Sequence, residues 1–465
     1  MGNLRTYPDL VAGTVFLLCG LVGAAAEVEQ GSVERPNIVF ILADDLGYGD
    51  LGSYGQRNIT TPNLDRVAAE GMRFTQFYAG STVCAPSRCV LMTGRHVGHA
   101  TVRANGDLPL RDDDVTMAEV LKQAGYATGV VGKWGLGQVS NGSDPLRQGF
   151  DSFYGYLHHL HAHNYYPSHL WRDRRKEPLE NVVPGETEHG AGIASRKVQY
   201  SHDMLIAEAL RFVERHKHEP FFLYLPLTIP HVNNEAKDRG MEVPDLGDYA
   251  ARDWPAPQKA HAAMISRMDA DIGRLLALLA NLGIDGRTIV FFSSDNGPHG
   301  GGGVEPEFND SNGPLRGMKR DLYEGGIRVP LLVRWPGRVP AGSTSDHVGF
   351  FGDILPTAAE LAGAPAPAGL DGISLVPELT GRSERQRQHE FLYWEFHEGA
   401  GGAQALRQGD WKAVRKPAFT GPLELYDLAT DVGESRDVAA EQPAQCARME
   451  AIMRREHASP RAQQP

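Results

Sequence analysis

A cysteine and an arginine four positions apart, Cys84 and Arg88, are the residues of this chain best placed to do chemistry. Pro86 suits a first helical turn, because its φ angle is already helical and its missing N–H needs no partner there. We therefore predict a short helix over residues 87–92, with Gly94 ending it. Cys84 then lies at a helix N-terminus, which favours an anion, and Arg88 adds donors shaped for a tetrahedral oxyanion. The pattern predicts covalent chemistry on a charged substrate.

Four apolar runs of the kind that form buried parallel strands each lead into polar residues. The runs are 37–43, 127–131, 220–225 and 288–292, and the polar residues after them are, in order, Asp44 with Asp45, Lys133, His231, and Asp295 with Asn296. In open α/β sheets ligands bind beyond the carboxyl ends of the strands, so we expect these side chains to converge at one edge.

Helical patterns between these runs indicate an α/β fold with a large mixed, mostly parallel sheet flanked by helices. Helices are expected after Thr61, after the capping box of Thr116 and Glu119, and over residues 262–282. Residues 325–333 are expected to return to strand.

A Pro/Ala/Gly-rich segment over residues 364–369 marks the predicted domain boundary. We expect a catalytic α/β domain over residues 35–368 and a smaller C-terminal α+β domain over residues 369–465. The second domain is expected to carry a short antiparallel sheet, with strand candidates at 391–394, 412–414 and 423–426 and a helix around 449–453.

The N-terminus has the composition of a secretory signal peptide over residues 1–26. Export to the periplasm or outside the cell is expected, or to a lysosome or the secretory route in a eukaryote, without a stable membrane span. Cys84, Cys89 and Cys446 remain after cleavage, and an odd count in an exported protein indicates a special thiol. A Cys84–Cys89 disulfide does not fit the short helix. The net charge of -12 argues against nucleic acid as a partner.

The strand-end residues combine an all-oxygen metal site with positive charge. Asp44, Asp45, Asp295 and Asn296 suit a hard cation such as Ca²⁺ or Mg²⁺ rather than zinc. Arg88, Lys133, His231 and Lys319 would face the same site. Metal and cations that converge on a helix N-terminus predict a site for a tetrahedral anionic ester. A histidine-rich segment over residues 155–166 is read as a surface loop or an aromatic pocket wall, with a zinc site as a weaker alternative.

The segment from Cys84 to Arg95 resembles the signature of the sulfatases, in which the cysteine is oxidised to formylglycine. The other shared motifs are Asp44-Asp45, Gly132-Lys133-Trp134, Pro230-His231, Asp295-Asn296-Gly297 and Lys319, in the family's order. The resemblance implies a sulfuric ester hydrolase of the type I sulfatase family, matured by a formylglycine-generating enzyme. Calcium would be held by Asp44, Asp45, Asp295, Asn296 and modified residue 84.

The resemblance also implies roles for the cations. An ionised hydroxyl of the aldehyde hydrate at residue 84, favoured by the metal and Arg88, would attack sulfur. Lys133 and Lys319 would hold sulfate oxygens, and His231 would protonate the leaving alcohol. The family has a histidine where this chain has Gly135, and we expect His159, His161 or His163 to replace it and to bind substrate.

The aromatic residues of the histidine-rich segment favour a sulfated glycan as substrate. Two other functions fit the same residues: a phosphate or phosphonate monoester hydrolase of the same superfamily, and a catalytically dead glycan-binding protein. The first predicts faster cleavage of an aryl phosphate than of an aryl sulfate. The second predicts an unmodified Cys84 and no sulfate release.

Overall fold

The structure, a computed structural model, describes residues 1, 2, 4, 35–106 and 108–459. The predicted signal peptide over residues 1–26 lies almost wholly outside the described residues, so export stays a prediction. Among the described residues, no helix is both long enough and apolar enough to cross a bilayer.

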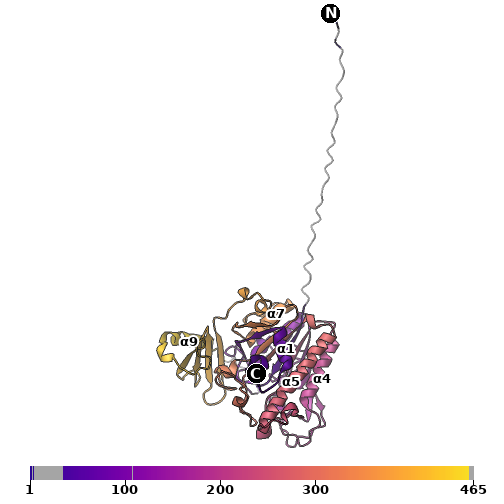
Figure 1. Cartoon of the computed structure of the whole chain (residues 1–465), viewed down its shortest axis with the longest axis vertical. Helices are drawn as coiled ribbons and strands as arrows, with labels where there is room; N and C mark the ends of the chain where they lie inside the picture. Colours follow the sequence, from indigo (N-terminus) through magenta and orange to yellow (C-terminus); the bar gives the residue numbers. More distant parts are fainter. Residues whose placement is uncertain (3, 5–34, 107, 460–465) are drawn as a thin grey trace. The chain divides into compact units, whose positions relative to one another are not determined.

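Figure 1 shows the chain coloured along its sequence, and its strands and α-helices have the following bounds. The strands are β1 (Asn37–Ala43), β2 (Met72–Phe74), β3 (Phe77–Tyr78), β4 (Ala127–Lys133), β5 (Ser152–Tyr156), β6 (His169–Arg172), β7 (Arg175–Pro178), β8 (Phe221–Pro226), β9 (Thr288–Ser294), β10 (Leu331–Arg334), β11 (Ser343–Ser345), β12 (Gly349–Phe350), β13 (Leu392–Phe396), β14 (Ala403–Gln408), β15 (Trp411–Arg415) and β16 (Leu423–Asp427). The helices are α1 (Pro62–Glu70), α2 (Cys84–Thr93), α3 (Met117–Gln123), α4 (Ser201–His216), α5 (Ala256–Asn281), α6 (Glu324–Ile327), α7 (Ile354–Ala362), α8 (Val376–Leu379) and α9 (Pro443–Glu456).

Ten strands form one large mixed sheet in the order β11-β2-β10-β9-β1-β8-β4-β5-β6-β7. The five central strands, from β9 to β5, run parallel, and antiparallel pairs flank them on both sides. The four runs that the sequence indicates as buried strands are β1, β4, β8 and β9, which lie next to one another in this order: β9, β1, β8, β4. Their carboxyl ends therefore meet at one edge of the sheet.

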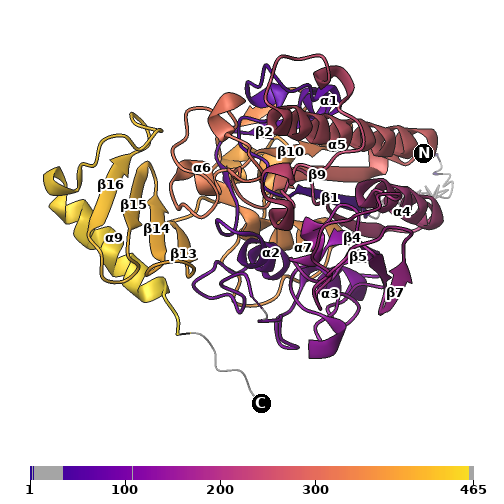
Figure 2. The same ribbon diagram turned by 90° about the horizontal axis from the view of Figure 1, so that it is seen from below.

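Both faces of the large sheet are buried at its central strands, as β1 shows. Its side chains alternate, so that Ile38, Phe40 and Leu42 join one hydrophobic cluster while Val39 and Ile41 join the other. Helices α2, α3 and α7 cover the first face, and α1, α4 and α5 cover the second (Figure 2). This explains why β1 is apolar at every position.

The C-terminal strands β13 to β16 form a separate antiparallel sheet in sequence order. One face packs against α9 through Leu406, Leu425 and Met453. The other face joins the core beside the large sheet, where Trp394 Nε1 donates a hydrogen bond of 2.9 Å to the Ala79 carbonyl. The α/β fold with a small antiparallel C-terminal sheet is thus confirmed; the exact boundary at residue 368 stays a prediction.

Several predicted elements differ in detail from those observed. Helix α2 begins at Cys84 rather than after Pro86, and α5 begins six residues before residue 262. Residues 325–333 are not one strand: α6 takes the first part and β10 starts at Leu331. The predicted capping box is confirmed, since Thr116 and Glu119 close the start of α3.

Candidate active site

The register of two parallel strands brings the acidic residues together. Strands β1 and β9 pair so that Ala43 lies opposite Ser294, and the next residues on each strand are Asp44 and Asp295. The Asp295 N–H donates to the Ala43 carbonyl over 3.1 Å, so the pairing extends past the strand end. Asp45 has φ 66°, and its N–H donates to Asp295 Oδ1 over 3.2 Å. This turn directs the Asp44 and Asp45 carboxylates into the same space.

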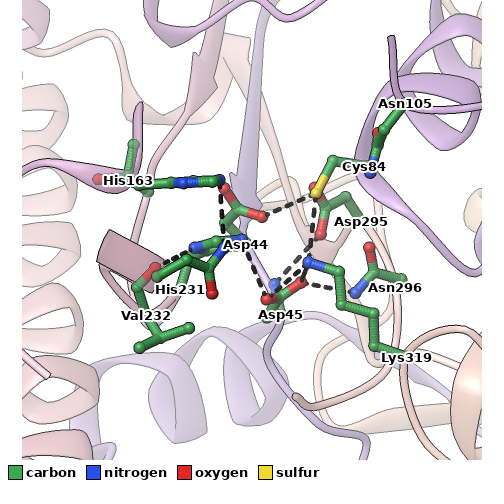
Figure 3. A network of polar contacts seen from close by, with 12 residues as sticks. Asp44, Asp45, Cys84, Asn105, His163, His231, Val232, Asp295, Asn296 and Lys319 are labelled. Atoms are coloured by element: carbon green, nitrogen blue, oxygen red, sulfur yellow. Dashed lines mark hydrogen bonds and ion pairs between the residues drawn. The ribbon is translucent and has the colours of Figure 1, made fainter. Parts of the chain in front are cut away.

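Cys84 faces these carboxylates from the first turn of α2, a helix whose residues are all buried. Its Sγ lies 3.4 Å from Asp44 Oδ1 and 3.6 Å from Lys319 Nζ. Figure 3 shows the side chains of Cys84, Lys319 and both aspartates pointing toward one another. The Gly94 backbone in the left-handed region, φ 69°, ends the helix as predicted. Cys84, Cys89 and Cys446 are free thiols, so no Cys84–Cys89 disulfide forms.

Three buried cations surround the aspartates. Arg88 Nη2 lies 2.7 Å from Asp295 Oδ2 and its Nη1 donates to the Lys133 carbonyl. Lys133, the last residue of β4, places Nζ 2.7 Å from Asp44 Oδ2. Lys319 places Nζ 2.7 Å from Asp45 Oδ1. Each cation pairs with a different carboxylate, so the desolvation of these charges is offset in pairs.

His231 reaches the site from the segment that follows β8. Its Nδ1 is 2.7 Å from the Val232 carbonyl, which can only accept, so Nδ1 carries the proton. Its Nε2 lies 3.5 Å from Asp45 Oδ2. His163 stacks on the His231 ring with a centroid distance of 4.8 Å (Figure 3), and His299 lies parallel at 6.2 Å on the same ring. The ring of His231 is therefore fixed by a hydrogen bond and by stacking.

Charge and burial set opposite protonation states within the site. Burial by itself would raise the pKa of Asp44, but Lys133, His231 and Arg88 hold it well below its usual range. Burial, reinforced by the negative Asp44, raises the pKa of Asp295 to about 6 and that of the Cys84 thiol to about 12. In this arrangement of charges, unmodified Cys84 is a protonated thiol at neutral pH.

The oxygen donors fit a hard cation. Asp44, Asp45 and Asp295 bring carboxylates from two strand ends, and Asp44, Asp45, Cys84 and His231 offer donor atoms within 4.8 Å of one another. Asn296 donates through Nδ2 to Asp45 Oδ1 over 2.8 Å, while its own Oδ1 is buried without a hydrogen-bond partner. A buried amide oxygen without a donor is expected where a cation binds.

The predicted substrate histidines lie in different places. His159 lines a small hollow together with Gly135, Leu157 and His158. Gly135 has φ 73°, and a Cβ there would meet no heavy atom nearer than Arg88 Cδ at 4.0 Å. The position thus opens beside Arg88, with His159 bordering it. His163 is at the active site through its stacking on His231, whereas His161 turns the other way, onto the rings of Tyr156 and His169.

Two site residues were missed from the sequence. Asn105 Oδ1 accepts from the Ala85 N–H over 3.0 Å and so satisfies a free donor in the first turn of α2. Glu398 Oε1, from the C-terminal segment, accepts from the Asn105 N–H over 2.8 Å. Asn105 lies outside the helices and strands, and Glu398 follows β13 of the C-terminal sheet, so the strand-end rule for the large sheet did not point to either residue. Through this pair the C-terminal segment reaches the start of the helix that carries Cys84.

Comparison with known proteins gives the same family from several directions. A model described as Sulfatase matches residues 36–364, and one described as N-sulphoglucosamine sulphohydrolase, C-terminal, matches residues 318–461. Human arylsulfatase A is 36% identical over 445 residues, which cover 86% of this chain and 82% of that protein. Pig (Sus scrofa) N-acetylgalactosamine-6-sulfatase is 34% identical over 80% of this chain and 71% of its own.

Solved structures agree. The crystal structure of Ps i-CgsB in complex with k-i-k-neocarrahexaose has a TM-score of 0.76 and 29% identity, over 92% of this chain and 94% of that one. A structure from work on the metabolism of multiple glycosaminoglycans by Bacteroides thetaiotaomicron has a TM-score of 0.75 and 26% identity, over 91% and 99% of the two chains. The chain belongs to the sulfatase family, whose members hydrolyse sulfuric esters.

Proposed function

We propose that this sulfatase removes sulfate from a sulfated carbohydrate, with residue 84 acting as formylglycine and Ca²⁺ held by the strand-end oxygens. One observation carries the proposal: a buried cysteine at a helix start lies among three carboxylates, an unpartnered amide oxygen and three cations. A formylglycine hydrate at residue 84 would supply one hydroxyl to attack sulfur with displacement of the alcohol, and a second hydroxyl whose deprotonation would let the aldehyde re-form as sulfate leaves.

The metal would be held by Asp44, Asp45, Asp295 and Asn296, and would supply Lewis-acid stabilisation of charge on sulfate oxygens. Of these ligands, Asn296 offers an oxygen without a hydrogen-bond partner, Oδ1. The three aspartates instead form ion pairs with the cationic side chains of the site. Lys133 Nζ lies 2.7 Å from Asp44 Oδ2, and Lys319 Nζ lies 2.7 Å from Asp45 Oδ1. Their ammonium groups are thus preorganised where negative charge develops in the transition state.

His231 is the proposed general acid. Because its Nδ1 proton is committed to the Val232 carbonyl, the proton for the leaving alcohol must be carried on Nε2, the nitrogen that faces Asp45. Burial holds the pKa of His231 well below its ordinary value, although Asp45 opposes this effect. Protonation of Nε2 therefore belongs to the substrate-bound state, in which an anionic ester adds negative charge.

The sulfatase family has a histidine at the position of Gly135. His159 is proposed to replace it, since His159 borders the open space beside Arg88. Burial, together with the nearby His158 and Lys133, lowers the pKa of His159 to about 2, so the ring is neutral at pH 7 and would accept a proton only in the complex with an anionic ester, whose negative charge raises that pKa. His161, whose ring lies against Tyr156 and His169, is the matched comparison. His159→Ala is expected to lower kcat more than KM changes, and to do so more than His161→Ala; full activity of the His159 variant would exclude this role.

The carbohydrate part of the proposal rests on the relatives. One is named for N-acetylgalactosamine-6-sulfate chemistry and one was solved with k-i-k-neocarrahexaose. The test is release of inorganic sulfate from sulfated mono- and oligosaccharides, with p-nitrophenyl sulfate and p-nitrophenyl phosphate as reference substrates. Faster cleavage of the aryl phosphate than of any sulfate ester would contradict the reaction. Cleavage of the aryl sulfate with no sulfated sugar cleaved would contradict the substrate class only.

A further inference from the structure

A second cluster of metal-ligand side chains includes His161 of the histidine-rich segment, whose ring contacts His169 and not His231. His161, His169 and Glu186 each offer one donor atom, and these atoms lie within 4.8 Å of one another. They come from three separate segments: the 3₁₀ turn His161–His163, the start of β6 and the loop that follows β7. The chain therefore builds this cluster by tertiary folding, not by a local run of residues.

The most informative atom of the cluster is His161 Nε2. The His161 side chain is buried, with 1% of its surface exposed, and Nε2 has no hydrogen-bond partner. Leaving such an atom without a partner costs free energy, so native structures rarely do it without reason. The ring is fixed by His169, whose centroid lies 4.5 Å away, and by Gly190, where an added Cβ would lie 2.5 Å from the His161 ring.

Glu186 is oriented toward the same place. Ser168 Oγ lies 2.8 and 2.6 Å from the two carboxylate oxygens of Glu186 and can donate to either of them. It can also accept from the Nδ1–H of His169, 3.0 Å away, which leaves His169 Nε2 to bind an ion. Glu186 Oε1 lies 3.6 Å from His169 Nδ1. Bonds of about 2.05 Å to a tetrahedral zinc ion place its ligand atoms about 3.4 Å apart, so small side-chain rotations close the site. A hydroxyl that holds a ligating carboxylate is a usual outer contact in metal sites.

We propose that His161, His169 and Glu186 bind a zinc ion. Two imidazoles and one carboxylate form a ligand set that zinc accepts, with a fourth position left for water. The protonation state of the two imidazole rings agrees with the geometry of the site, because burial lowers the pKa of His169 to about 4 and that of His161 well below its usual value. Both imidazoles are thus neutral at pH 7, as metal ligands must be.

A comparable cluster of two histidines and a glutamate has no buried ring nitrogen without a hydrogen-bond partner. His96, His99 and Glu456 also offer donor atoms within 4.8 Å. The Gly98 N–H donates to His96 Nδ1, so the His96 proton is on Nε2, which lies 3.3 Å from Glu456 Oε2. His99 Nδ1 is likewise paired with Asp371 at 3.0 Å. This cluster is satisfied internally as hydrogen bonds and ion pairs, and it provides the control.

The zinc site would brace the wall of the active site. His161 and His163 lie on the same single turn, and His163 stacks on His231. The site is distinct from the proposed calcium site in donors, since it offers imidazole nitrogens where the other offers oxygens. Its occupancy can therefore be measured without turnover and without reference to the reaction.

The test uses the full untagged chain with Cys84→Ala and Cys446→Ser, which removes the active-site and half-exposed thiols as zinc ligands. After chelator treatment and exchange into excess Ca²⁺, zinc is titrated by calorimetry, and Co²⁺ is added in parallel to look for the visible bands of a tetrahedral site. We expect one zinc per chain and a higher melting temperature with zinc. Ser168→Ala is expected to weaken binding by about 10- to 100-fold, the usual effect of losing an orienting group.

Glu186→Gln, on a half-exposed loop, is expected to weaken zinc binding at least as much as Ser168→Ala does, and His161→Ala to remove it. Glu186→Gln is expected to retain the fold even if the buried histidine variant does not, because its side chain is partly exposed. Glu456→Gln in the other cluster should leave the affinity unchanged. The proposal is overturned if the starting protein binds no zinc, or if Glu456→Gln abolishes binding while Glu186→Gln does not.

Discussion

Lys319 provides a quantitative test of how the active site stabilises charge. Its Nζ lies 2.7 and 2.9 Å from the two oxygens of Asp45 and 3.6 Å from Cys84 Sγ, and the side chain is buried. Although burial opposes the charged form, Asp45 and Cys84 raise the pKa of Lys319 above its usual value, so it remains a cation. Lys319→Met keeps the length of the side chain and removes the charge.

The expected loss in kcat is about 10²- to 10³-fold, or about 2.7 to 4 kcal/mol, the usual effect of removing one preorganised donor from a developing anion. The assay is the initial rate on an aryl sulfate at saturating Ca²⁺. Calcium affinity, measured separately, should rise or stay unchanged, because the substitution removes a cation that competes for Asp45.

Lys416→Met is the matched control. Lys416 pairs with Asp321 at 2.9 Å, but both side chains are more than a third exposed, so its loss should change the rate by no more than about twofold. The reasoning fails if Lys319→Met keeps kcat within about threefold of the parent protein. It also fails if that variant binds calcium more weakly while remaining folded.

Three further perturbations follow from single contacts. Asp50 is fully buried, and burial raises its pKa from 3.8 to about 7. The folded state therefore binds the Asp50 proton more tightly than the unfolded state does. As the pH rises from about 4 to about 7, the free energy of unfolding should fall by at most about 4 kcal/mol because of this group. Asp50→Asn, which can still accept from the Gly47 N–H, should flatten this part of the profile in urea unfolding at several pH values; an unchanged slope would show that Asp50 is not responsible. Lys412 is buried 2.9 Å from Glu324 and 3.3 Å from Glu434, so Lys412→Met should lower the free energy of unfolding by about 3 to 5 kcal/mol. Adding Glu324→Gln should restore part of this loss, since Glu434 stays without its cation; an additive double variant would mean that Lys412 and Glu324 are not coupled. Asn296→Ala removes the unpartnered amide oxygen and should weaken calcium binding, measured by calorimetry; it also removes the hydrogen bond from Nδ2 to Asp45 Oδ1, so the free energy of unfolding should fall by about 1 to 3 kcal/mol, and unchanged calcium affinity would remove Asn296 from the ligand set.

The strand-end residues could be predicted because a single rule of parallel sheets places them. Asp44 comes directly after its buried apolar run and Asp295 comes two serines after its own, and parallel register then brings them side by side. Lys133 could be predicted for the same reason, because it is the last residue of β4. Lys319 was also expected at the site, but the strand-end rule does not place it, because its position depends on a loop anchored by the hydrogen bond from its N–H to the Pro298 carbonyl.

Other parts of the fold depend on contacts that the local sequence does not carry. Strand β14 is the partner of both β13 and β15, yet its residues have no strong strand pattern of their own. The three histidines grouped as substrate contacts separate in the structure because residues two apart on a helical turn point to opposite sides. His163 therefore faces His231, and His161 faces His169. The role of each remains to be tested by substitution.

The identity of residue 84 is the point on which the proposed mechanism depends. The decisive measurement is the mass of the peptide spanning Cys84, from protein made together with a formylglycine-generating enzyme. The account predicts that the side chain has lost its sulfur and carries an aldehyde, and that sulfate release rises in proportion to the converted fraction. A peptide that retains an ordinary thiol in protein that hydrolyses sulfate esters at full rate would contradict it.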